Sequence, residues 1–140
     1  MSKKPDSVYV FGPIFMHGQD YLPVYKRLMK LCDKHFSKTV GTWPDFWDSK
    51  ETPREFYDRT YESIKDLDLF VAEVSVSSAG VGMECQMGAQ HNIPLIALCQ
   101  EGKDISPMTS GLPNLRQVIK YTSVDDLQSQ LEQAITELKK

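Results

Sequence analysis

The chain has 140 residues, of which 41% are hydrophobic and 25% charged, and its formal net charge is -3. This size and composition fit one globular domain, residues 1–140, with a hydrophobic core. The acidic balance gives no reason to expect nucleic acid or an acidic membrane as a partner, and no apolar run reaches the roughly 18 residues of a membrane span.

Strands and helices alternate along the first half of the chain. A β-rich run at Ser7–Phe11 ends at a Gly-Pro pair, and apolar residues at helical spacing predict a helix over about 20–36. A weaker strand is predicted at 37–43 and an irregular loop at 44–51. Thr52, Pro53 and Glu55 then form a capping box with proline at the first helical position, so a helix is expected to run from there to about residue 66.

The second half continues the alternation. A near-continuous apolar run at 67–74 predicts a central parallel strand that is buried on both faces. A glycine-containing loop and a short helix to about residue 91 follow, then strands at 94–99 and 116–121. Ser123 is expected to cap a final helix with an apolar stripe.

Five strands alternating with helices predict an α/β fold. Parallel strands need crossover helices, so we expect an open, doubly wound five-stranded parallel sheet, Rossmann- or flavodoxin-like, with helices on both faces. Ligands bind such sheets outside the carboxyl ends of the strands. The site is therefore expected in three loops, at residues 12–18, 75–82 and 100–114.

The cysteines and the first residues of the chain indicate the cellular compartment that we expect for the protein. Cys32, Cys85 and Cys99 are odd in number, scattered and set in apolar surroundings, with no metal-ligand spacing. The start, MSKKPDS, lacks the apolar core of a signal peptide. We expect reduced core thiols in a cytoplasmic protein that uses no metal and no cofactor.

Two acidic residues flank the loop at 75–82. Glu84 follows the glycines Gly80 and Gly82, which are typical of phosphate-binding loops but also of tight turns. A carboxylate at a helix N-terminus is held ionised by the helix dipole and is suited to attack an electrophilic carbon. The residues alone leave two roles open for Glu84, a nucleophile or an ordinary first-turn acid. Glu73 is expected either to point into the site or to pair with a neighbour.

The segment DLFVAEVSVSSAGVGMECQMGAQHNIPLIAL resembles the signature of the nucleoside 2-deoxyribosyltransferase family, including its 2'-deoxynucleoside 5'-phosphate N-hydrolase branch. Looser similarity at VYVFGPIF and VIKY extends the resemblance over most of the chain. It implies a small nucleotide or nucleoside as substrate and Glu84 as the nucleophile that forms a glycosyl-enzyme. It also implies that Tyr9 orients this carboxylate and that Gly80 and Gly82 let the substrate approach the backbone. Gly12 and Phe15, in the first loop, are expected to bind the substrate.

Two serines favour the hydrolase branch. Ser78 stands six residues before Glu84, at a position where the transferases have an aspartate. An aspartate there would repel a 5'-phosphate, whereas the hydroxyl of a serine can donate a hydrogen bond to it. Ser106 matches a serine that, in the hydrolases, reaches the phosphate in the neighbouring subunit's site. The resemblance therefore implies a homodimer or higher homo-oligomer. The end of the chain, ITELKK, offers no aromatic residue of the kind that closes the transferase site.

Other positions depart from the family pattern. Pro13 and Phe15 stand where the hydrolases hold phosphate with a serine and an arginine, so weaker discrimination for phosphate is expected. Thr60 replaces an aspartate, and Asp58 lies about 200° away around the helix, too far to take its place. Phe15 and either tryptophan, Trp43 or Trp47, are candidates to stack on a base.

The sequence thus predicts an N-glycosidase that hydrolyses (deoxy)nucleoside 5'-monophosphates through Glu84. Two alternatives stay open. One is a deoxyribosyltransferase that exchanges bases, and the other is a non-catalytic nucleotide-binding module, to which the loss of the aspartate at Thr60 would point.

Overall fold

The computed structural model describes residues 4–16, 19–41 and 50–140. Its main sheet has the order β4-β1-β5-β6-β7, and every neighbouring pair is parallel. In chain order within this sheet the strands run 2-1-3-4-5, which is the flavodoxin-like order. The predicted doubly wound parallel sheet is confirmed. Its strands are β1 (Ser7–Phe11), β4 (Lys38–Gly41), β5 (Leu69–Glu73), β6 (Leu95–Gln100) and β7 (Leu115–Tyr121).

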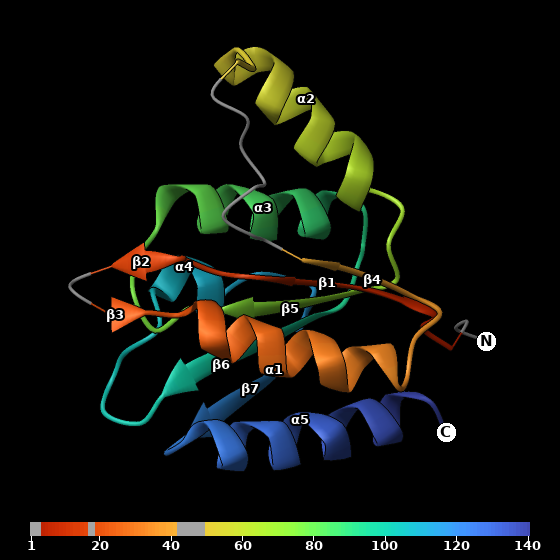
Figure 1. The fold of residues 1–140 in the computed structure, drawn as a ribbon, viewed down its shortest axis with the longest axis vertical. Helices are drawn as coiled ribbons and strands as arrows, with labels where there is room; N and C mark the ends of the chain where they lie inside the picture. Colours follow the sequence, from red (N-terminus) through yellow and green to blue (C-terminus); the bar gives the residue numbers. More distant parts are fainter. Residues whose placement is uncertain (1–3, 17–18, 42–49) are drawn as a thin grey trace.

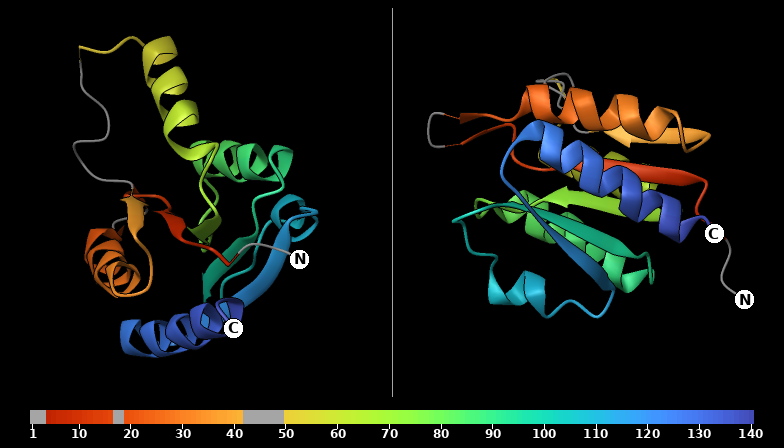
Figure 2. Two further views of the ribbon diagram at one scale, coloured as in Figure 1. Left: turned by 90° about the vertical axis from the view of Figure 1, so that its right-hand side faces the viewer. Right: turned by 90° about the horizontal axis from the view of Figure 1, so that it is seen from below.

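Helices cover both faces of this sheet. Helices α1 (Leu22–Asp33) and α5 (Val124–Leu138) lie on one face, and α3 (Ala79–Gln90) lies on the other (Figure 1; Figure 2). Helix α2 (Pro53–Ile64) lies over α3, and only Ile64 among its residues is buried. The α2 helix therefore forms one wall of the space above α3 rather than part of the central core.

Each face of the sheet has its own hydrophobic core, because side chains alternate along every strand. On β1, Val8 and Val10 pack toward α1 and α5, whereas Tyr9 and Phe11 pack toward α3. The rings of Tyr9 and Phe11 stack with centroids 4.4 Å apart, and Phe70 meets both rings edge-on at 5.5 Å. This aromatic cluster fixes the Tyr9 ring on the α3 side of the sheet.

Local capping signals predicted some helix starts correctly and misplaced another. The capping box of Thr52 and Glu55 is present in both directions, and Ser123 caps α5. Helix α3, however, begins at Ala79 with Ser78 as its N-cap, so the glycine pair lies inside the helix and the loop prediction was wrong there. The structure also adds two elements that the sequence did not predict, a hairpin of β2 (Phe15–Met16) with β3 (Gln19–Asp20) and the short helix α4 (Pro107–Ser110).

Three further features concern the expected compartment and chemistry. The three cysteines are free and buried, as predicted. None of the helices within the described residues has both the length and the apolar character needed to cross a membrane. The same residues contain no group of three or more histidine, cysteine or acidic side chains that could hold a metal ion.

At Gly88, helix α3 packs closely against the sheet. A Cβ atom at this position would lie 2.7 Å from two atoms of the Phe70 ring. We expect Gly88→Ala to lower the free energy of unfolding by about 1–3 kcal/mol, because the ring must move within a packed core. Urea denaturation measures this change.

Gly82→Ala is the matched control on the same helix. A Cβ at Gly82 meets nothing within 4 Å, so the better helix propensity of alanine should leave stability unchanged or raise it by up to about 1 kcal/mol. Similar effects from the two variants would show that α3 does not depend on this close approach.

Candidate active site

The start of α3 determines where Glu84 lies. The Ser78 hydroxyl accepts a hydrogen bond from the Val81 amide at 3.4 Å, which places Glu84 in the second turn of the helix. The helix dipole acts mainly within the first turn. The expectation that the dipole and free amides hold Glu84 ionised was therefore wrong.

Tyr9 and Glu84 meet above the sheet. The Tyr9 hydroxyl donates a hydrogen bond to Oε2 of Glu84 at 2.8 Å, which joins the middle of β1 to the second turn of α3. Burial raises the pKa of the Glu84 carboxyl to about 7, although the hydrogen bond from Tyr9 opposes this rise. The protonation of Glu84 therefore changes with pH near neutrality.

Glu84 faces a cleft between α2 and α3, which we call the α2–α3 cleft. It has two adjoining compartments of about 180 and 230 Å³, and both are lined by Thr60 and Glu84. The smaller one also contacts Tyr9, Val40, Gly41, Arg59 and Ser63. The larger one is mostly apolar and also contacts Pro53, Phe56, Tyr57, Gly80, Met83 and Met87.

Ser78 and Ser106 lie elsewhere, on a second hollow of about 330 Å³ that we call the serine cavity. Gly82 lines this cavity, whereas Gly80 lines the α2–α3 cleft. Two residues on a helix are about 200° apart, so the two hollows lie on opposite sides of α3. Both serines belong to the same chain here, and Ser106 also caps α4 by accepting a bond from the Met108 amide at 3.2 Å.

The first-loop candidates have a different environment. Gly12 is buried, and a side chain there would collide with the Tyr25 hydroxyl and with Cβ of Glu73. Gly12 therefore makes room for the protein's own residues, and its contact with a substrate stays a prediction. Trp43 and Trp47 lie outside the described residues, as does the side chain of Phe15.

Helix α2 presents a threonine and an arginine to the cleft. Thr60 lines both compartments, and Asp58 is turned away in an ion pair with Arg54 at 3.1 Å, as the helical geometry predicted. The sequence analysis missed Arg59, which lines the smaller compartment. The one sign of it in the sequence is its place next to Thr60. Neighbouring residues on a helix point about 100° apart, so both can line one cleft.

Glu73 does not share the cleft. It is fully buried, and its Oε1 accepts a bond from the Ser75 amide at 2.5 Å while its Oε2 accepts one from the Tyr121 hydroxyl. Burial raises the pKa of Glu73, and these hydrogen bonds oppose the rise. Of the two roles left open by the sequence, pairing with a neighbour is the one observed.

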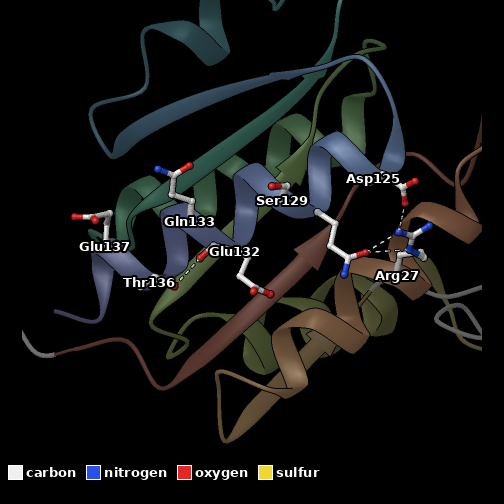
Figure 3. A pocket seen from close by; sticks show the side chains of 8 residues that line it. Arg27, Asp125, Ser129, Glu132, Gln133, Thr136 and Glu137 are labelled. Carbon is white, nitrogen blue, oxygen red and sulfur yellow. Dashed lines mark hydrogen bonds and ion pairs between the residues drawn. The ribbon is translucent and has the colours of Figure 1, made fainter.

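A larger groove of about 580 Å³ lies between α1 and α5, across the sheet from Glu84 (Figure 3). Arg27 projects from α1 toward α5, where it bonds to Asp125 at 2.5 Å and to Gln128. The groove contains no residue that the sequence analysis proposed for the site. We therefore place the candidate site at the α2–α3 cleft and the serine cavity.

The doubly wound sheet and the half-buried carboxylate that faces a cleft are the features for comparing this chain with known proteins. No protein-family model matches the chain. A Methanosarcina mazei protein is 33% identical over 128 residues, which is 86% of this chain and 78% of that protein. A Syntrophotalea carbinolica protein is 37% identical over 83 residues, or 58% of each chain, and a Thermofilum pendens protein is 34% identical over 85 residues, 58% of this chain and 59% of its own.

All three relatives carry the provisional name 2'-deoxynucleoside 5'-phosphate N-hydrolase 1. The chain belongs to their family, the nucleoside 2-deoxyribosyltransferase-like proteins, so the resemblance seen in the sequence is confirmed. The matches to the S. carbinolica and T. pendens proteins span less than three fifths of those relatives.

Two solved structures share the fold. Clostridium botulinum CMP N-glycosidase BcmB has a TM-score of 0.66 and 20% identity, covering 89% of this chain and 98% of its own. A conserved protein of Enterococcus faecalis V583 has a TM-score of 0.68 and 18% identity, covering 93% and 99%. At such low identity these likenesses show the fold alone.

The bond between Tyr9 and Glu84 predicts a measurable shift in pKa. Tyr9→Phe removes a hydrogen bond to the ionised carboxylate, so the pKa of Glu84 should rise by about one to two units, the equivalent of about 1.5–3 kcal/mol. Carbon-13 NMR of the glutamate carboxyls measures it. Tyr57→Phe, which removes another hydroxyl lining the cleft, should leave this pKa in place. An unchanged or lowered pKa in Tyr9→Phe would show that the bond does not stabilise the ionised form.

Proposed function

We propose that the chain is an N-glycosidase that hydrolyses the base–sugar bond of (deoxy)nucleoside 5'-monophosphates, with Glu84 as the nucleophile. The observation that carries the proposal is the Glu84 carboxylate, which faces the α2–α3 cleft while Tyr9 bonds to its Oε2. Orienting one oxygen in this way leaves Oε1 to attack carbon. The names of the three relatives support a nucleotide as the substrate.

The reaction follows from the position of this carboxylate. Oε1 of Glu84 attacks C1' of the sugar, the C1'–N bond breaks, and the base leaves with the electron pair. Water then attacks C1' and releases the phosphorylated sugar, so that its hydroxide ends on the sugar and its proton on the base. Only the ionised carboxylate is a nucleophile, and with a pKa of about 7 its fraction grows as the pH rises through neutrality.

The 5'-phosphate is assigned to the serine cavity. Ser78 and Ser106 present hydroxyls there, and the first-turn amides of α3 favour an anion at the start of the helix. Gly80 lies between the start of α3 and Glu84. A side chain at Gly80 would project into the open cleft. The substrate would then extend from its phosphate at the start of α3 to its base in the cleft.

Assembly and location remain predictions. Ser78 and Ser106 line one cavity, and the role of Ser106 at the phosphate of a neighbouring subunit is still the expectation from the family resemblance. A homodimer and a cytoplasmic location are still the expectations that the family resemblance and the composition give.

Glu84→Gln is the direct test of the proposed function. It keeps the shape of the side chain but removes the charge, so turnover of monophosphates should fall by about a thousandfold or more while binding persists. Release of free base, followed by chromatography over a panel of nucleosides and monophosphates, measures turnover. Glu62→Gln, an exposed change on α2, should behave as the wild type.

Other outcomes of the panel identify the alternatives. Near-normal turnover by Glu84→Gln would remove the nucleophile role. Formation of a new nucleoside when a second base is added would identify a transferase, and tight nucleotide binding without release of base would identify a binding module.

Ser78→Asp tests the phosphate assignment. Aspartate is as good an N-cap as serine, so helix α3 keeps its start while the added charge repels a phosphate. We expect the wild type to prefer monophosphates over nucleosides by about a hundredfold, from two bonds to a charged group, and the variant to lose most of this preference in kcat/KM. Ser129→Asp, the same change at an exposed residue of α5 across the sheet, is the control. An unchanged preference in Ser78→Asp would move the phosphate elsewhere.

A further inference from the structure

The described residues that line the α2–α3 cleft include no second acid to protonate a leaving base. Among its described lining residues, Glu84 is the sole carboxyl group and there is no histidine. The residue in the place of the family aspartate, Thr60, has only a hydroxyl. The cleft does contain a permanent positive charge, the guanidinium of Arg59.

Arg59 is held in a defined orientation. Its Nε and Nη2 bond to the two carboxylate oxygens of Glu51 at 2.6 and 2.9 Å, and its guanidinium carbon lies 5.5 Å from the centre of the Phe56 ring. The Glu51 side chain is only 17% exposed. A bidentate ion pair and a ring contact fix the plane of a guanidinium.

The position of Arg59 associates it with the base rather than with the phosphate. The serine cavity lies on the opposite side of α3, so a nucleotide with its phosphate there directs its base toward α2. The larger compartment offers Phe56, Met83 and Met87 to the flat faces of a base. It meets the Arg59 compartment at Thr60 and Glu84, where the breaking bond would lie.

We propose that Arg59 stabilises the departing base and thereby makes pyrimidine nucleotides the preferred substrates. The inference rests on the proposed function of Glu84. As the bond from Oε1 to C1' forms, the C1'–N1 electron pair passes into the pyrimidine ring and spreads to its O2 atom. An N–H of Arg59 donates to O2, and water afterwards supplies the proton to the base and the hydroxide to C1'.

The preference follows from what arginine can and cannot donate. Its guanidinium donates hydrogen bonds but keeps its proton at any ordinary pH, so it assists a base that leaves as an anion. A purine leaves readily only after a ring nitrogen has received a proton from an acid. Arg59 is the charged donor among the described residues that line the cleft, and an arginine that cannot give up its proton favours the departure of pyrimidines.

Arg59→Gln tests the proposal through the dependence on the leaving group. We expect wild-type kcat to be higher for 2'-deoxyuridine monophosphate than for deoxyguanosine monophosphate, and the variant to lose about ten- to a hundredfold on the former. For 5-fluoro-2'-deoxyuridine monophosphate, whose base is a better leaving anion, the loss should be clearly smaller. Arg54→Gln, an exposed change about one and a half turns earlier on α2, should alter none of these rates, and thermal unfolding checks that both variants are folded.

Three results would overturn the inference. These are an equal loss on the uracil and fluorouracil substrates, a wild-type preference for purines, and a loss confined to KM for monophosphates, which would assign Arg59 to the phosphate. If base release requires Glu84 but ignores Arg59, this inference fails and the proposed function stands. If no monophosphate releases its base, both fail.

Discussion

The buried carboxylate of Glu73 is the constraint on which the arrangement of the site depends. A carboxylate with no solvent contact is costly unless its oxygens are hydrogen-bonded, and Glu73 meets this need with the Ser75 amide and the Tyr121 hydroxyl. Ser75 in turn accepts a bond from the Gln100 amide at 2.7 Å. These bonds join the ends of β5, β6 and β7 and fix the direction in which the chain leaves β5. The start of α3, and therefore Glu84, follows from that direction.

Two glutamates eleven residues apart thus differ in what surrounds them. Glu73 points toward the α1 and α5 side of the sheet, where protein donors occupy both of its oxygens. Glu84 points to the other side, where Tyr9 bonds to one oxygen and a cleft opens beside the carboxylate. Burial raises the pKa of both groups, but of the two only Glu84 lines the cleft. Environment, rather than residue type, separates the structural carboxylate of Glu73 from Glu84, the proposed nucleophile.

The sequence predicted what local signals determine. Apolar and β-rich segments alternating with helical patterns indicated all five strands, and the capping box at Thr52 indicated the start of α2. The start of α3 was misplaced because glycines lower helix propensity, whereas the cap at Ser78 decides this start. Family resemblance indicated Tyr9 and Glu84, and the structure brings them together. The pKa of Glu84, the separation of the two cavities and the place of Arg59 arise from tertiary packing, which no local pattern encodes.

The central claim is that Glu84 forms a covalent bond to the sugar, and a trapped intermediate tests it most directly. A monophosphate with fluorine on C2' of its sugar should form the glycosyl-enzyme but lose it slowly, because fluorine disfavours positive charge at C1'. Mass spectrometry of the denatured protein should then show one added fluoro-sugar phosphate, and peptide mapping should place it on Glu84. An adduct on another residue, or release of base from this substrate with no adduct at any time, would contradict the account.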